Sequence, residues 1–271
     1  MHERISAGQT CFPDAGLAQL AGYWRELAPR RVSFVSPTLL TEPLSAVQQV
    51  LSSGGYRVET ITHVFMPGQH LSPEETSWQQ PRAQLTQLIE IARQIDARSI
   101  YLLTGGHGSL TWEQAAAAFC GAVAPCAAQA KAAGVSLLIE PASVLHADLH
   151  IVHSLRDTLA LAEMADLGVC IDFFACWTEA GLRETMMRAI PRCDIIQVSD
   201  YVYGDRALPS RAVPGDGVIP LWRLLEWVLA AGYAGAFDLE LLGPRIDHEG
   251  RVPAVARAAG ELGRMLRSLG A

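Results

Sequence analysis

Short apolar runs rich in β-branched residues recur along the chain and predict strands. The predicted strands cover residues 4–12, 31–39, 57–65, 98–106, 135–142, 169–177, 195–201 and 237–243. Between them lie longer segments in which apolar residues recur three or four positions apart, which is the helical period. The clearest predicted helices cover residues 14–29, 83–97, 112–134, 154–168 and 220–235. Thr111 and Ser154 precede two of these helices and are suited to act as N-caps.

The alternation of strands and helices predicts the fold class. It runs through eight strand-then-helix units without a long linker or a change in composition. This pattern predicts an α/β protein built as one (β/α)8 TIM barrel, with residues 1–271 forming a single domain. A doubly wound open sheet is the alternative. The first predicted turn, GQTCFPDAG (8–16), lacks the G-x-G-x-x-G spacing of dinucleotide-binding sheets, which favours the barrel.

Composition and charge exclude several classes of partner. The 271 residues carry a formal net charge of -7, which argues against a nucleic-acid partner because phosphate binding needs a basic face. No apolar run reaches the length of about 18 residues that predicts a membrane span. The first residues lack the apolar core of a secretory signal. The six cysteines have no metal-type spacing and most lie in apolar runs, which indicates reduced thiols in a cytoplasmic protein.

Polar residues stand at or near the ends of the later predicted strands. They are Glu140, Asp172, Gln197, Asp200 and Glu240, with His107 following the fourth strand. In a barrel, parallel strands bring these ends to one rim, where converging carboxylates would repel one another and lose hydration. A divalent cation relieves both effects, and oxygen ligands suit Mn²⁺ or Mg²⁺. Read singly, each residue could instead cap its strand or anchor a loop.

The order of motifs resembles that of the xylose isomerase-like TIM-barrel family, the sugar phosphate isomerases and epimerases of the AP endonuclease 2 superfamily. The motifs are IEP (139–141), Asp172, QVSD (197–200), RAVPGDG (211–217) and DLELLG (238–243). The resemblance covers nearly the whole chain. It implies a divalent metal held by Glu140, Asp172, Gln197 and Glu240, with Mn²⁺ or Mg²⁺ as the ion.

Two positions depart from the family pattern. Ala175 replaces the histidine of a D-x-x-H motif, and Gln197 replaces the histidine of an H-x-x-D motif that is normally a metal ligand. An amide oxygen is a harder ligand than imidazole, which shifts the preference from Zn²⁺ towards Mg²⁺ or Mn²⁺ and weakens binding. A catalytically inactive barrel acting as a binding protein is therefore a rival interpretation.

The resemblance also implies an activity. Glu140 and Glu240 would transfer a proton through an enediolate, which isomerises or epimerises a sugar or polyol derivative. A lyase that dehydrates a keto-sugar or keto-inositol on the same site is the alternative. The expected partner is a small-molecule carbohydrate or polyol, with no nucleic acid and no membrane.

Further residues are candidates for contact with the substrate. They are Arg211, His107, Trp177 and His63, and Phe174 could supply an apolar wall. Their alternative roles are a surface salt bridge for Arg211, a loop histidine for His107 and core packing for Trp177. Trp222 and Trp227 suggest a homo-oligomer, although they could also pack on the sheet.

Overall fold

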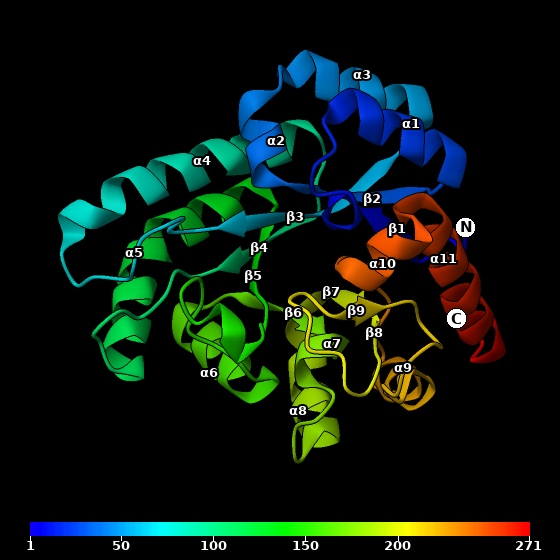
Figure 1. The fold of residues 1–271 in the computed structure, drawn as a ribbon. Helices are drawn as coiled ribbons and strands as arrows, with labels where there is room; N and C mark the ends of the chain where they lie inside the picture. The colour runs from blue at the N-terminus through cyan, green and yellow to red at the C-terminus, as the bar shows by residue number, and fades with distance from the viewer.

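Eight parallel strands close into a barrel in the computed structural model, which describes residues 1–271. The strand order around the barrel is β1-β10-β7-β6-β5-β4-β3-β2, so the first and last strands pair and close it (Figure 1). The strands are β1 (Ile5–Gly8), β2 (Arg31–Val35), β3 (Arg57–Val64), β4 (Ser99–Leu103), β5 (Ser136–Ile139), β6 (Gly168–Asp172), β7 (Cys193–Val198) and β10 (Ala236–Leu239). The predicted (β/α)8 barrel is confirmed.

Helices surround the barrel on its outside (Figure 1). They are α1 (Leu17–Leu27), α2 (Ser36–Thr41), α3 (Leu44–Gly54), α4 (Gln79–Gln94), α5 (Trp112–Ala133), α6 (Leu155–Ala165), α7 (Phe173–Cys176), α8 (Leu182–Ala189), α9 (Leu221–Ala230), α10 (Pro244–Glu249) and α11 (Arg251–Ser268). Thr111 and Ser154 cap α5 and α6, since their hydroxyls accept the backbone N–H of Gln114 and Asp157. No helix combines the length and the apolar character that crossing a membrane requires.

The period of two along each strand determines what fills the barrel. Tyr101, Leu138, Cys170, Ile195 and Ala236 form a small buried cluster separate from the main core between strands and helices. Two residues further along the same strands come polar side chains, including Glu140, Asp172 and Gln197. Alternate residues of a strand share a face, so the polar side chains lie above this apolar layer, towards the carboxyl ends.

A two-stranded antiparallel sheet lies after β7. It pairs β8 (Asp200–Tyr201) with β9 (Arg211–Ala212), and the predicted strand 195–201 covers part of β7 and all of β8. Asp200 fixes the segment after β9 because its carboxylate accepts backbone N–H groups from Gly215 at 2.9 Å and from Gly217 and Ile219 at 3.0 Å. This carboxylate therefore sets where β9 and its first residue lie.

Candidate active site

Four charged side chains line one cavity at the carboxyl end of the barrel. Glu140 follows β5, Asp172 ends β6, Arg211 begins β9 and Glu240 follows β10. The cavity has a volume of about 270 Å³. The three carboxylates meet at one place because parallel strands of a barrel deliver their ends to one rim, and β9, outside the barrel sheet, brings Arg211 to them.

Arg211 lies between two of the carboxylates. Its Nη2 is 2.9 Å from both Asp172 Oδ2 and Glu240 Oε2, and its Nη1 donates to Asp172 Oδ1 at 3.3 Å and Ser199 Oγ at 3.1 Å. The guanidinium also lies over the Phe174 ring, 4.6 Å from its centre. Glu240 Oε2 lies this close to Arg211 Nη2, but the two groups are not oriented for a hydrogen bond, so the oxygen keeps a free lone pair. Arg211 is part of a mostly buried ion network, which excludes the surface salt bridge as its role.

Burial shifts the proton affinity of the two glutamates. It raises the pKa of Glu140 well above its ordinary value, and the negative charges of Glu240 and Asp172 raise it further. Burial also raises the pKa of Glu240 to about 7, against the opposing charge of Arg211. A carboxyl group whose pKa is raised by burial holds a proton more readily than a free one, so the two glutamates are suited to accept and donate a proton in acid–base catalysis.

Two side chains of the apolar layer form hydrogen bonds with Gln197. Its Nε2 donates to the Tyr101 hydroxyl at 3.1 Å, and its Oε1 accepts a weak hydrogen bond from Cys170 Sγ at 3.3 Å. Tyr101 in turn accepts from Thr62 Oγ1. Gln197 is fully buried beside Asp172 on the neighbouring strand, and it does not line the cavity itself. Its side chain therefore lies between the apolar layer of the barrel and the charged side chains that line the cavity.

The donor set fits a divalent metal ion in charge and in chemistry. When ionised, the three carboxylates are balanced by one guanidinium, which leaves two negative charges uncompensated. All the donors are oxygens, which suits Mn²⁺ or Mg²⁺. Arg211 Nη2 serves as the chain's own cation here, equally distant from oxygens of two carboxylates. In this arrangement no three His, Cys, Asp or Glu side chains form a ready ligand group.

Three of the predicted substrate contacts lie away from the cavity. His107 is exposed in the loop after β4, and Trp177 lies beside Tyr201 and Tyr203 at ring-centre distances of 6.4 and 6.5 Å. His63 is buried against Ser36 of α2, with its Nδ1 2.8 Å from the serine hydroxyl. None of the three lines the cavity, whereas Phe174 does.

Two residues without a predicted role support the site. His146 lines the cavity from the loop after β5. His150 is fully buried, and its Nδ1 accepts the backbone N–H of Thr104 at 3.0 Å, so its Nε2 carries the proton and donates to the carbonyl oxygen of Glu140 at 2.6 Å. His150 therefore orients the backbone of Glu140. In the sequence, His146 and His150 stand out only by their H-x-x-x-H spacing, which resembles a zinc pair but has no helical framing.

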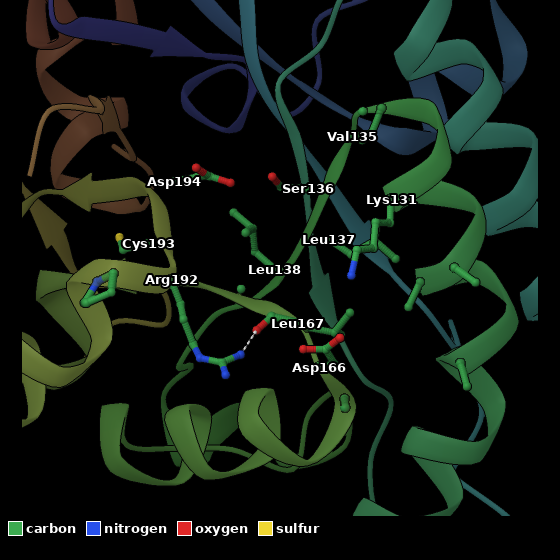
Figure 2. Close-up of a pocket in the computed structure, with 17 residues that line it drawn as sticks. Lys131, Val135, Ser136, Leu137, Leu138, Asp166, Leu167, Arg192, Cys193 and Asp194 are labelled. Atoms are coloured by element: carbon green, nitrogen blue, oxygen red, sulfur yellow. Dashed lines mark hydrogen bonds between the residues drawn. The ribbon is translucent and has the colours of Figure 1, made fainter.

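A larger hollow of about 780 Å³ lies at the opposite end of the barrel. Figure 2 shows Lys131 of α5, Asp166 and Arg192 around it, with Arg192 donating to the carbonyl oxygen of Leu167. These three charged side chains form no ion pair with one another. Because active sites of such barrels lie at the carboxyl ends of the strands, the smaller, charged cavity is the candidate.

The fold and the site together define a (β/α)8 barrel with a carboxylate-rich site at the carboxyl ends of its strands. The chain matches the family model described as "Xylose isomerase-like TIM barrel" over residues 17–269. The chain therefore belongs to the xylose isomerase-like TIM-barrel family, which confirms the resemblance found in its motifs. The comparison with curated proteins gives no match.

Solved structures share the whole architecture. A protein from Sinorhizobium meliloti 1021 is similar at 22% identity, with a TM-score of 0.84 and 98% of each chain covered. D-Psicose 3-epimerase from Clostridium cellulolyticum H10, solved with D-tagatose, has 15% identity and a TM-score of 0.75, covering 98% of this chain and 96% of its own. The IOLI protein, solved with a bound zinc atom, has 11% identity and a TM-score of 0.80, covering 98% and 99%. At these identities the similarity shows the fold.

Proposed function

We propose that the protein is an isomerase or epimerase of a sugar or polyol derivative, dependent on a divalent metal, with Mn²⁺ or Mg²⁺ as the ion. The observation that carries the proposal is the meeting of Glu140 and Glu240 in one cavity with Asp172 and Arg211. The raised pKa values of both glutamates support a role in proton transfer. The similarity in fold to D-psicose 3-epimerase favours the same class of reaction.

The chain's own residues account for the proton transfer. One glutamate, in its ionised form, takes a proton from the carbon next to a carbonyl group. The other, in its protonated form, donates its own proton to the opposite side of that carbon or to the neighbouring carbon. Arg211 stabilises the negative charge of the enediolate that forms in between. Glu140, Asp172 and Glu240 would hold the metal together with Gln197, whose amide oxygen would have to leave Cys170 and turn into the cavity. The bound metal would polarise the substrate's oxygen. For the metal to bind, Arg211 must move away from the carboxylates. Its guanidinium is then free to contact the substrate.

Exchange of carbon-bound hydrogen tests the proposal directly. Aldoses, ketoses and inososes are incubated with the protein and Mn²⁺ in ²H₂O, and deuterium at carbon is measured by NMR. The wild type is expected to incorporate deuterium into its substrate, and Glu140→Gln and Glu240→Gln to lose at least a hundredfold in rate. Glu163→Gln, on the outer surface of α6, is the matched control. Protein that neither binds Mn²⁺ by calorimetry nor exchanges hydrogen would be the inactive barrel instead.

We further propose that residues 1–271 act as one domain in the cytoplasm. All six cysteines are free thiols, which supports a reducing compartment. Trp222 is 42% exposed on α9 and supports a contact between subunits on that face.

A further inference from the structure

The cavity has two chemically different walls. One is the charged group of Glu140, Asp172, Arg211 and Glu240. The other is apolar and consists of Leu103, Pro141, Leu145, Leu149, Phe174, Leu208, Pro209 and Leu242. The remaining polar side chains are few, namely Ser143, His146 and Ser210. Apolar atoms therefore provide most of the surface that a bound molecule would meet.

The apolar wall continues out of the cavity into water. Leu145 and Leu208 line the cavity, and their exposed fractions are 64% and 54%. Their loop neighbours Val144 and Tyr203 are 65% and 72% exposed. These four are half of the large apolar side chains exposed on the molecule, and they lie in two loops that border one cavity. Exposed apolar side chains gathered at a site indicate binding of an apolar group there.

A free sugar fits this surface poorly. It carries a hydroxyl on nearly every carbon, and each hydroxyl placed against a leucine loses hydrogen bonds to water without replacement, which weakens binding. A substrate with hydroxyls on one side only would satisfy both walls. The volume of about 270 Å³ accommodates little beyond one sugar-sized ring, so any substituent extends through the mouth between Leu145 and Leu208.

We propose that the substrate of this site is a hydroxy-ketone or polyol derivative that carries an alkyl or aryl group. The polar part faces the four charged residues, and the apolar group lies between Leu145 and Leu208. This inference rests on the proposed function for the polar part, and it adds that the specificity of the site comes from the two loops.

Calorimetric binding of n-alkyl β-D-glucopyranosides, from methyl to hexyl, tests the inference without turnover. Affinity for the wild type is expected to rise about two- to fourfold with each methylene group, since burial of a CH₂ contributes about 0.8 kcal/mol at most. Leu145→Ser and Leu208→Ser should each reduce this gain. Met187→Ser is the matched control, because Met187 is 53% exposed on α8 and does not line the cavity.

Three outcomes would overturn the inference. The first is an affinity that does not depend on chain length. The second is a gain in affinity per methylene group that Met187→Ser reduces as much as the two leucine variants do. The third is dissociation of an oligomer by Leu145→Ser in sedimentation, which would show that a second copy covers the mouth. The outcome is separable from that of the proposed function. If the protein exchanges deuterium but its affinity does not depend on chain length, only this inference is wrong. If its affinity depends on chain length but no deuterium is exchanged, the protein is a binding protein for the same ligand class.

Discussion

Arg211 holds Asp172 in a two-point ion pair across 39 positions of sequence. Nη2 donates to Oδ2 at 2.9 Å, and Nη1 donates to Oδ1 at 3.3 Å. The side chains are 12% and 2% exposed, so water screens their attraction little. The pair connects β9, which lies outside the barrel sheet, to the end of β6 inside it.

Removal of Arg211 should destabilise the fold strongly. Arg211→Leu leaves Asp172 and Glu240 buried without their cation, and the free energy of unfolding in urea is expected to fall by roughly 3 kcal/mol. Arg98→Leu breaks an exposed pair with Asp194 and should cost less than about 1 kcal/mol. Equal losses in the two variants would contradict a buried ion network.

Replacement of Gln197 by histidine should change the preference among metals. Gln197→His would introduce an imidazole where the family motif has one, and imidazole nitrogen favours Zn²⁺ over Mn²⁺. Calorimetry is expected to show at least a tenfold gain for Zn²⁺ relative to Mn²⁺. Gln197→Asn, which keeps an amide, is the control. An unchanged ratio in the histidine variant would remove Gln197 from the ligand set.

Asp238 should make the stability depend on pH. It lies two residues before Glu240, fully buried, and accepts from Ser33 Oγ at 2.9 Å. Burial raises its pKa to about 7 from an ordinary value of 3.8, against the hydrogen bond from Ser33. Between about pH 4 and pH 7 the folded state thus holds a proton that the unfolded state has released. The resulting stability is complete below about pH 4 and is lost as the pH rises through about 7.

Asp238→Asn cannot ionise and should escape this loss. Its melting temperature is expected to fall less than that of the wild type between pH 5 and pH 8, because each unit of pKa shift corresponds to roughly 1.4 kcal/mol. Glu163→Gln, exposed on α6, should follow the wild-type curve. Parallel curves for wild type and Asp238→Asn would mean that Asp238 is not the titrating group.

Asp200 should prove necessary for the segment after β9. Asp200→Ala removes the acceptor of four backbone N–H groups, those of Tyr201, Gly215, Gly217 and Ile219. The expected loss of unfolding free energy is roughly 2–4 kcal/mol. Hydrogen exchange should show faster exchange of the amides of residues 215–219 in the variant. Unaltered protection there would show that the turn forms without the carboxylate.

The sequence predicted the parts of the site that follow from strand period and strand order. The residues after β5 and β10 and at the end of β6 share one rim in any parallel barrel, so Glu140, Asp172 and Glu240 could be placed together. His63 could have been placed outside by the same alternation. Thr62 bonds to Tyr101 in the barrel interior, so His63 must face the helices, where it meets Ser36.

The remaining features depend on contacts between distant segments. No local pattern shows that β8 and β9 pair over only two residues each, so the place of Arg211 between Asp172 and Glu240 was not predictable. Likewise, α2 begins inside the predicted strand 31–39, because Ser36 and Pro37 start a helix directly after β2. The apolar wall is built from two loops, whose course follows no periodicity.

The chain is held in place on both sides of residues 202–210, and this affects how the barrel could acquire new ligands. Pairing of β8 with β9 fixes where that segment departs and returns, and the Asp200 carboxylate anchors the chain beyond it. The length and composition of residues 202–210 can therefore vary between descendants of one ancestor without displacing Arg211. The charged residues then stay in place while one of the two loops at the cavity mouth changes, so specificity can diverge through changes in that loop alone.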